Sequence, residues 1–365
     1  MPSPTHIRKI ITIFNRGNIN DSLVNTVTPV ISGTQVVDST LTSTTGTWSE
    51  LSTYTYQWYR GISLISGATS STYTLVQADA GNTSNITCQV TATSSGGSAI
   101  ATSNTLTQIL DLDANAFLTA ASISDSTEKN AVNSLTIDLK TASIWTKMKA
   151  VYPFVGGTST THKWNLKNPL DTDAAYRLTF SGGWVHSANG ALPNGTNGYA
   201  NTYLNALTDL LQFSHHHSFY HNTDNVDIIG RSLGGVQASG SINFRTTLEG
   251  SGTQIAFRDL GGVNSDSGYT SSTLKGFRAS SRIANNNQFQ IKQDGTATTP
   301  TTSIVANNLP SLNCYLAAEA NTLAPSRYSI MQIAFHSIGD GLTTSEGLSL
   351  RNAINTFQTT LGRNV

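Results

Sequence analysis

The sequence predicts an all-β protein with two successive β-sandwich domains and one amphipathic helix at its C-terminal end. Short runs of alternating apolar and polar residues recur along most of the chain, separated by turn residues, as in antiparallel strands. At 365 residues the chain is longer than one hydrophobic core usually serves. Its hydrophobic residues, 38% of the total, are regularly placed, which argues against disorder despite the richness in Ser and Thr.

Residues 1–24 are expected to form an N-terminal arm. Ile7, Ile10 and Ile11 lead into a short β-like run that ends at Gly17 and Asn18. This apolar run has no obvious partner strand in the segment that follows. We therefore expect the arm to add a strand to a neighbouring protein and to act as an attachment element.

Residues 25–109 are expected to form the first sandwich. Turn residues recur there roughly every 8 to 12 positions. In TYTYQWYR, Tyr54, Tyr56 and Trp58 share one face, and in ITCQVTA, Ile86, Cys88, Val90 and Ala92 do the same. These two segments are predicted to be core strands.

Residues 110–365 are expected to form the larger second sandwich. After a connector at about 110–117, Asp125 and Glu128 read as a capping pair for a helix over residues 126–141. A long series of strands follows, among them AYRLTFSG, in which Tyr176, Leu178 and Phe180 alternate with polar residues.

The C-terminal helix has the clearest pattern in the chain. Thr343 and Glu346 form a T-x-x-E capping box, and Gly362 stands at the position of a helix-ending glycine. Between them lies an apolar stripe of Leu350, Ala353, Ile354, Phe357 and Leu361 at helical spacing.

The first sandwich resembles the immunoglobulin-like modules of bacterial and phage proteins. The resemblance rests on GTW, YQWYR, GATSSTYTL, ADAG and ITCQVTA. Trp58 matches the buried strand-C tryptophan of that family and Cys88 the strand-F cysteine. Leu41 stands where the partner cysteine would be, and Ile86 replaces the corner tyrosine, so the resemblance implies the fold without its disulfide.

Residues 115–365 resemble concanavalin A-like lectin/glucanase domains, through CYLAAEAN, YSIMQIAFHSIGDGL and the helix that follows. FVGGT, AYRLTFSGGW, NGTNGYANT and NTFQTTLGRNV are similar to segments of structural proteins of tailed phages, including crAss-like phages. The resemblance implies a non-enzymatic component of a phage virion surface, a head (capsid) fibre or decoration subunit. A tail-fibre lectin that recognises host surface glycans is the alternative, and a glycan depolymerase is a more distant one.

The same resemblance sets expectations about partners and location. The chain is expected to form a homo-oligomer, a trimer as in phage fibres, and to contact capsid or tail proteins through its arm. It is expected to be made in the bacterial cytoplasm and to reside in the virion.

Composition argues against other partners. Only 12% of residues are charged, and 21 Lys and Arg balance 21 Asp and Glu, so no net charge attracts nucleic acid or an anionic membrane. No apolar run approaches the length of a membrane span or a signal sequence. Cys88 and Cys314 lie in separate predicted domains, which favours neither a disulfide nor a metal site.

One pattern imitates a serine hydrolase. Gly230 to Gly234 spell G-x-S-x-G around Ser232, with Asp259 and His336 downstream in the order of an α/β-hydrolase. A nucleophile elbow needs a helix after the serine, whereas glycines and another strand are predicted here. We interpret the pattern as a glycine-rich strand or hairpin.

The sequence also contains few pairs of carboxylates that could catalyse glycoside hydrolysis. The i, i+2 acidic pairs are Asp111 with Asp113 in the connector and Asp171 with Asp173 in a predicted turn. No E-x-D or E-x-E falls inside a predicted strand, where two carboxylates would face one cleft. These acids are interpreted as solvated turn residues.

Two other clusters remain as binding candidates. His215, His216 and His217, with Tyr220 and His221, form the densest cluster of ligand-type side chains. They would hold a metal only if a third ligand or a three-fold axis converged on His215 and His217, so a polar aromatic face is the favoured interpretation.

Trp184, His186 and Tyr199 lie among glycine-rich loops, where they would either stack on a sugar or anchor the sandwich edge. From the sequence we therefore assign no catalytic, cofactor-binding or metal-binding residue, no cofactor, and no enzymatic activity.

Overall fold

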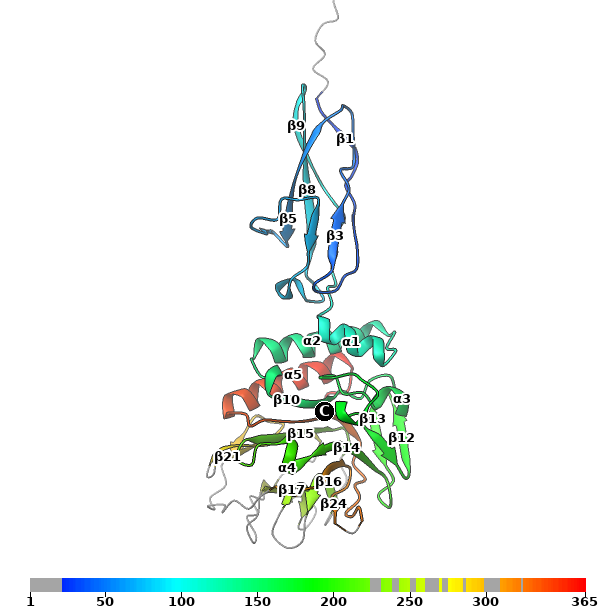
Figure 1. Ribbon diagram of the computed structural model, residues 1–365, viewed down its shortest axis with the longest axis vertical. Helices are drawn as coiled ribbons and strands as arrows, with labels where there is room; N and C mark the ends of the chain where they lie inside the picture. Colours follow the sequence, from blue (N-terminus) through cyan, green and yellow to red (C-terminus); the bar gives the residue numbers. More distant parts are fainter. Residues whose placement is uncertain are drawn as a thin grey trace, which may run out of the picture. The chain divides into compact units, whose positions relative to one another are not determined.

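A computed structural model describes residues 22–223, 231–237, 243–249, 254–259, 269–270, 275–284, 287–298, 309–322 and 324–365. The chain forms two compact units (Figure 1). Unit 1 comprises the described residues up to 35 together with 39–75 and 84–107, and unit 2 comprises 36–38, 76–83 and the described residues from 108 onwards. The expected attachment arm falls almost entirely on residues 1–21, which lie outside the described residues.

Unit 1 consists of three small antiparallel sheets. The largest has the order β6 (Ser63–Leu64), β5 (Thr53–Arg60), β8 (Ile86–Ser94) and β9 (Gly97–Thr102). A second pairs β2 (Ile31–Ser32), β3 (Thr40–Ser43) and β7 (Thr72–Thr74), and a third pairs β1 (Asn25–Val27) with β4 (Thr47–Trp48).

The core of unit 1 contains the residues that the alternation predicted. Trp58 on β5 lies opposite Cys88 on β8, and both side chains are fully buried, as is Leu41 on β3. Ile86, Val90 and Ala92 are buried on the same face of β8. Both cysteines of the chain are buried and free. Packing rather than a cross-link therefore holds this unit together.

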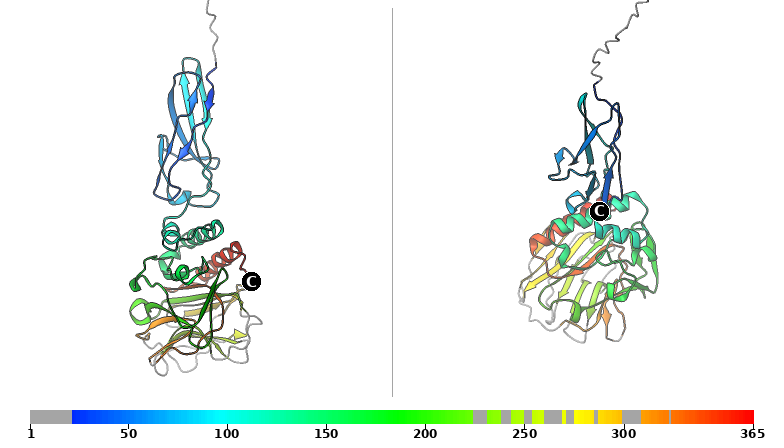
Figure 2. Two further views of the ribbon diagram at one scale, coloured as in Figure 1. Left: turned by 90° about the vertical axis from the view of Figure 1, so that its right-hand side faces the viewer. Right: turned by 45° about the horizontal axis from the view of Figure 1, so that its top comes forward.

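Unit 2 is built in three layers: helices, an inner sheet and an outer sheet (Figures 1 and 2). The helical layer contains α1 (Leu112–Ala120), α2 (Ser126–Thr141) and α5 (Thr344–Thr360). The inner sheet has the order β12 (Trp184–Ser187), β13 (Gly190–Pro193), β25 (Ile333–Gly339), β15 (His215–His221), β20 (Gly276–Ala284), β21 (Asn287–Ile291) and β22 (Ala297–Thr298), and β10 (Met148–Tyr152) also pairs with β25. The outer sheet has the order β11 (Thr179–Ser181), β14 (Tyr199–Asn205), β23 (Asn313–Leu316), β16 (Arg231–Gln237), β17 (Asn243–Glu249), β18 (Gln254–Asp259) and β19 (Tyr269–Thr270), and β24 (Ala320–Asn321) runs parallel to β16.

Short helical turns complete unit 2. They are η1 (Gln77–Asp79), η2 (Trp145–Lys147), α3 (Ser159–His162), η3 (Asp173–Ala175) and α4 (Ala206–Asp209).

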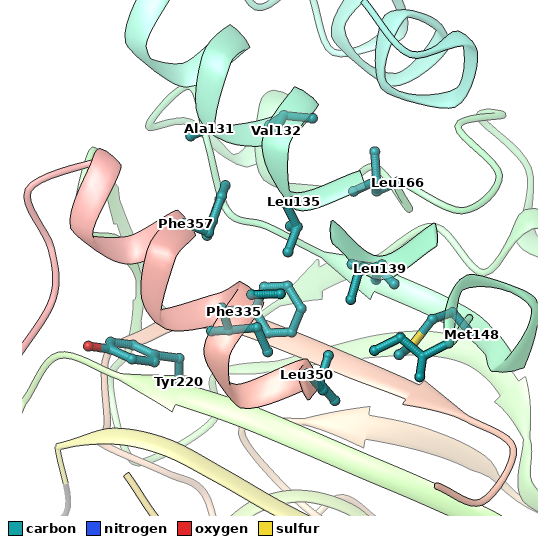
Figure 3. Close-up of a cluster of buried hydrophobic side chains, with 14 of the residues drawn as sticks. Ala131, Val132, Leu135, Leu139, Met148, Leu166, Tyr220, Phe335, Leu350 and Phe357 are labelled. Atoms are coloured by element: carbon teal, nitrogen blue, oxygen red, sulfur yellow. The ribbon is translucent and has the colours of Figure 1, made fainter. Parts of the chain in front are cut away.

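A large apolar cluster joins the helices to the inner sheet (Figure 3). Leu135 and Leu139 of α2 and Phe357 of α5 meet Phe335 and Tyr220 of the sheet there. A second cluster between the two sheets includes Tyr152, Phe154, Leu178, Phe219, Leu233 and Leu316. The inner sheet is therefore buried on both faces. In the outer sheet β14 and β23 alternate between buried and partly exposed residues, whereas β16 is buried from Ser232 to Val236.

The fold class predicted from the sequence is confirmed: the protein is mainly β, sandwich-like, and ends in a helix. Helix α2 occupies the expected residues, with Asp125 as its N-cap. Thr343 is the N-cap of helix α5, Glu346 in its first turn completes the capping box, and Gly362 takes a φ of +68° beyond its end.

Two local expectations were wrong. The connector at about 110–117 is largely helical, because Asp111 caps α1 by accepting hydrogen bonds from the backbone of Asp113 and Ala114. Tyr176 does not belong to a strand. It ends η3 in a left-handed conformation with a φ of +57°, and the strand begins only at Thr179.

Unit 2 includes two segments that precede residue 108 in sequence. The Val37 amide donates to the Leu110 carbonyl, and Gly81 pairs with Ile109. The Asn82 side chain donates to the Asn130 carbonyl at 3.0 Å and accepts from Asn133 at 3.1 Å, both on α2. None of the described helices is long and apolar enough to span a membrane.

Candidate functional site

The G-x-S-x-G segment does not form a nucleophile elbow. Ser232 lies within β16, which continues to Gln237, and its hydroxyl is fully buried near the carbonyls of Gly234 and Thr246. His336 belongs to the other sheet, and its Nδ1 lies 2.9 Å from the Ser218 carbonyl oxygen. The side chain of Asp259 is outside the described part of the structure. Residues 231–234 of the pattern thus lie in a strand, where the hydrolase mechanism needs a helix directly after the serine.

The two acidic pairs are bound to neighbouring cations. Lys140 lies 2.7 Å from both Asp111 and Asp113. Asp171 pairs with Lys163 at 2.6 Å, and Arg177 lies 3.2 Å from Asp171 and 2.9 Å from Asp173. Asp171 and Asp173 are exposed, as expected of solvated turn acids. The same expectation was wrong for Asp111, which is fully buried because it caps α1 and pairs with Lys140.

The histidine run lies inside the sandwich. Every residue of β15 is buried, and His217 lies with its Nε2 2.7 Å from the Thr246 hydroxyl. His216 Nδ1 is 2.6 Å from the Asp340 carbonyl oxygen. The described residues contain no group of three or more His, Cys, Asp or Glu arranged to hold a metal.

Burial sets the protonation state of His216, His217 and His221 in this run, and of two other core histidines, His162 and His336. It lowers the pKa of His162, His221 and His336 to about 3 and that of His216 to about 4. It also lowers the pKa of His217 well below its ordinary value. The imidazoles are consequently neutral at physiological pH.

Trp184 and His186 are packed together, but not with Tyr199. Their rings lie 6.0 Å apart, and Phe180 packs edge-on against both, at 5.2 Å from Trp184 and 4.6 Å from His186. Trp184 Nε1 donates to the carbonyls of Ser181 and Tyr199. This cluster joins the edges of the two sheets, so its ring faces are turned toward one another.

Tyr199 instead belongs to a group of four half-buried tyrosines, which we call the tyrosine platform: Tyr199, Tyr203 and Tyr315 on strands of the outer sheet, and Tyr328 in the segment between β24 and β25. Tyr199 and Tyr315 stand on neighbouring strands, with ring centroids 4.8 Å apart and planes inclined by 31°. Burial, and then the proximity of the other three phenols, raises the pKa of Tyr315.

Strand alternation turns the platform away from the core. On β14, Ala200, Thr202 and Leu204 are buried, whereas Tyr199 and Tyr203 are partly exposed. On β23, Tyr315 stands between the buried Cys314 and Leu316. The polar face of the outer sheet thus carries the tyrosines.

The outer tyrosines of the platform are fixed by hydrogen bonds. Tyr203 shares one with Thr179 at 3.1 Å, and Tyr328 donates to the Pro325 carbonyl at 2.9 Å. In the part of the chain that the structure describes, no hydrogen bond involves the hydroxyls of Tyr199 or Tyr315. The central pair therefore offers two apolar ring faces and two uncommitted hydroxyl groups.

The flanks of Tyr315 differ. On one side its strand partner is Asn201, whose Oδ1 accepts from the Tyr203 amide and whose side-chain NH₂ is left as a donor. On the other side its partner is Gly235, with a φ of +124°. Because glycine has no side chain, nothing from that position stands beside the ring.

The structure also contains a cavity of about 340 Å³ at the start of α2. It is lined by Asp125, Thr127, Glu128, Gly156, Gly157, Ala188 and Leu361. One oxygen of Asp125 caps α2, and one oxygen of Glu128 accepts from the Gly156 amide. No aromatic ring lines this cavity, which makes it a poorer match to a sugar than the tyrosine platform.

Sequence reasoning found Tyr199 but missed the rest of the platform. The outward positions of YANTYLN hold Tyr199, Asn201 and Tyr203, and that alternation was a usable signal. Tyr315 joins them only through the pairing of β14 with β23, segments far apart in the sequence.

Comparison with known proteins gives fold likenesses and no family. No family model matches the chain, and no curated protein is similar in sequence. A mutant Trypanosoma rangeli sialidase with trans-sialidase activity is similar in structure, with a TM-score of 0.44 and 10% identity over 91% of this chain and 53% of the sialidase.

Two further structures are similar. The T. rangeli sialidase in complex with sialic acid has a TM-score of 0.38 and 11% identity over 87% of this chain and 52% of its own. Domain 4 of AbnA, an extracellular arabinanase from Geobacillus stearothermophilus in complex with arabinotriose, has a TM-score of 0.31 and 14% identity over 56% of this chain and 98% of its own. The chain spans about half the length of the sialidases.

These matches overturn one expectation from the sequence. A purely structural, non-enzymatic virion subunit is contradicted, because the similar structures come from glycan-processing enzymes. With TM-scores below 0.5, the likeness assigns neither a substrate nor a catalytic residue to this chain. Any function has to be argued from the site itself.

Proposed function

We propose that unit 2 binds a glycan on the tyrosine platform. The observation that carries the proposal is the Tyr199–Tyr315 pair, two adjacent, partly exposed rings whose hydroxyls are uncommitted within the described structure. A sugar ring has an apolar C–H face and a rim of hydroxyl groups. A tyrosine supplies a matching apolar face together with a polar hydroxyl.

The surroundings of the pair support this proposal. The Asn201 amide provides hydrogen-bond donors on one flank, and Gly235 adds no side chain on the other. Tyr203 and Tyr328 are held by hydrogen bonds, so the platform loses little side-chain freedom when a ligand binds.

The experiment is binding of the labelled full-length protein to an array of bacterial and plant polysaccharides, followed by titration of the best ligand. We expect Tyr315→Ala and Tyr199→Ala each to weaken binding at least about tenfold, which corresponds to ~1.4 kcal/mol. Tyr59→Ala in unit 1, also a half-buried tyrosine on a strand, is the matched control and should leave the affinity unchanged.

Three results are informative. Binding that both platform variants retain would refute the proposal. If the platform variants change their oligomeric state but keep their glycan affinity, a second copy of the chain covers the platform instead. Release of oligosaccharide from the bound polymer would make the glycan a substrate and the chain an enzyme.

We also propose where this glycan is found. The resemblance of residues 115–365 to tailed-phage proteins supports a glycan on the surface of a bacterial host. It also supports a virion location, with residues 1–24 as the attachment element to capsid or tail proteins and a trimeric assembly. Deleting residues 1–20 should then remove the protein from purified virions, and a normal copy number by mass spectrometry would refute the attachment role.

A further inference from the structure

Three Asn-Gly dipeptides lie close together in unit 2, at residues 189–190, 194–195 and 197–198. The first joins β12 to β13, and the other two are in the loop between β13 and β14. In an Asn-Gly dipeptide the backbone nitrogen of the glycine can attack the side-chain amide of the asparagine, because glycine has no side chain to hinder the approach. The three dipeptides have the same chemistry in the sequence, so only the structure distinguishes them.

The side-chain carbonyl of Asn194 is held by three backbone donors. Its Oδ1 accepts hydrogen bonds from the amides of Thr196 at 3.0 Å, Asn197 at 3.1 Å and Gly198 at 3.0 Å. The bond from the amide two residues ahead folds the side chain back over the peptide bond between Asn194 and Gly195. The three donors also polarise the side-chain carbonyl, and they would stabilise the negative charge that forms on Oδ1 when Cγ is attacked.

The attacking atom at this dipeptide is available as well. The Gly195 amide forms no hydrogen bond with any residue that the structure describes. Its N–H can therefore lose its proton without first breaking a hydrogen bond. Asn194 is exposed, so water and hydroxide reach it. This dipeptide combines an activated carbonyl group with an available nucleophile.

Each of the other two dipeptides has a different deficiency. The Asn197 side-chain carbonyl also accepts hydrogen bonds, from the Gly183 amide at 3.0 Å and from Asn194 Nδ2 at 2.7 Å. Its nucleophile is occupied, however, because the Gly198 N–H donates to Asn194 Oδ1. Asn189 is exposed, but no donor within the described ranges reaches its side-chain carbonyl. The chain thus contains one internal control for each of the two features.

We propose that Asn194 is a modification site, at which the folded protein deamidates spontaneously. The Gly195 nitrogen forms a bond to Cγ of Asn194, and the bond from Cγ to Nδ2 breaks. The side-chain NH₂ group leaves as ammonia with the proton that Gly195 gives up, and a cyclic imide remains. Water then opens the imide at either of its carbonyls, which leaves an aspartate or an isoaspartate with a negative charge.

The two products differ in how well they fit the loop. The aspartate keeps the three backbone donors, which a carboxylate binds more strongly than an amide does, and loses only the bond to Asn197 Oδ1. The isoaspartate lengthens the main chain before Gly195, whose carbonyl accepts from Arg231 Nη1 at 3.0 Å. Because the loop ends at Tyr199, either product places a negative charge in the segment that leads into the tyrosine platform.

The test is peptide mapping by mass spectrometry of the full-length protein during incubation at mildly alkaline pH. The folded protein is compared with the protein unfolded in guanidinium chloride, where the three dipeptides should react at similar rates. In the folded protein we expect Asn194 to react at least about tenfold faster than Asn189 and Asn197, and faster than it does when unfolded. This is less than the roughly 10²–10³ that one donor contributes in an enzyme, because the loop is exposed.

Isoelectric focusing gives an independent measurement. Because 21 Lys and Arg balance 21 Asp and Glu, a new carboxylate should produce an acidic band that grows with time. Asn194→Ser keeps an oxygen acceptor for the loop amides but has no amide nitrogen to lose, so it should lack this band. Asn189→Ser is the matched control and should retain it. Thermal melting verifies that each variant is folded.

The wild-type protein alone is sufficient to overturn the proposal. If Asn194 reacts no faster in the folded protein than in guanidinium chloride, the loop does not activate the residue. Faster reaction at Asn189 or Asn197 in the folded protein would contradict the roles given to the free nucleophile and to the three donors. An acidic band that persists in Asn194→Ser would show that the new charge arises at another residue.

Discussion

Acidification should unfold unit 2 well before unit 1. His162, His216, His217, His221 and His336 are buried in unit 2 and have pKa values depressed by that burial, four of them to about 3 or 4. In the unfolded chain the same groups titrate near 6.5. As the pH falls, the unfolded state therefore binds more protons than the folded state.

The direction of the effect follows from the depressed pKa values. The contribution of neutral histidines to stability is complete above about pH 7.5 and is lost progressively as the pH falls from 6.5 toward the folded-state values. Lowering the pH from 7.5 to 5.5 reduces the free energy of unfolding by about 1.4 kcal/mol for each such histidine, and by about 7 kcal/mol for the five together. A typical domain is stable by only about 5–15 kcal/mol, so this loss is decisive.

The geometry explains why these charges are hard to accommodate. The His336 ring is stacked between Tyr152 and Phe219, with centroids at 5.8 and 4.5 Å, and its Nε2 has no hydrogen-bond partner among the described residues. The His221 ring also stacks on Phe219, with centroids at 5.8 Å, near the positive charge of Arg278. A proton added at either Nε2 would place a charge where no described acceptor stands.

The assay is hydrogen exchange read by mass spectrometry between pH 5 and 8, with rates corrected for the intrinsic pH dependence of exchange. Unit 1 is the internal control, because residues 25–107 contain no histidine. Protection of β15 and β25 should decrease steeply below pH 6.5, while protection of β5 and β8 changes little. His221→Gln should reduce the steepness for unit 2 by about one fifth. Unchanged protection of unit 2 between pH 7.5 and 5.5, or an equal loss in unit 1, would refute the reasoning.

Three further predictions concern stability and reactivity. Dithiothreitol should leave the melting curve unchanged, because Cys88 and Cys314 are free thiols, and a lower melting temperature would reveal a disulfide between molecules. Phe357→Ala should lower the free energy of unfolding of unit 2 by about 3–5 kcal/mol by leaving a cavity against Phe335, whereas Phe357→Leu should cost about 1 kcal/mol; urea titration compares the two. A fluorophosphonate probe should not label Ser232, which is buried within a strand, and stoichiometric labelling that His336→Ala abolishes would contradict this.

Local signals were sufficient for some elements. Helices α2 and α5 were predicted at their observed residues because a capping pair and an apolar stripe are both encoded within one segment. Helix α1 was missed because it is short and its apolar residues are not confined to one stripe. Its clearest marker, Asp111, also reads as an ordinary connector acid.

The site could be predicted only in part, since it depends on pairing between distant strands. Trp184, His186 and Tyr199 were grouped as one candidate, but the sequence does not show that Trp184 and His186 pack against Phe180 and each other. Tyr199 was recognised without Tyr315, its partner across β14 and β23.

The segments at 36–38 and 76–83 matter for anyone who wishes to exchange unit 2 between proteins. A hybrid gene joined at residue 110 would leave behind Asn82, and the Asn133 amide on α2 would lose one of its acceptors. The Leu110 carbonyl would likewise lose the Val37 amide. Recombination that preserves unit 2 therefore has to transfer these two short stretches with it, so the natural crossover point lies upstream of residue 36.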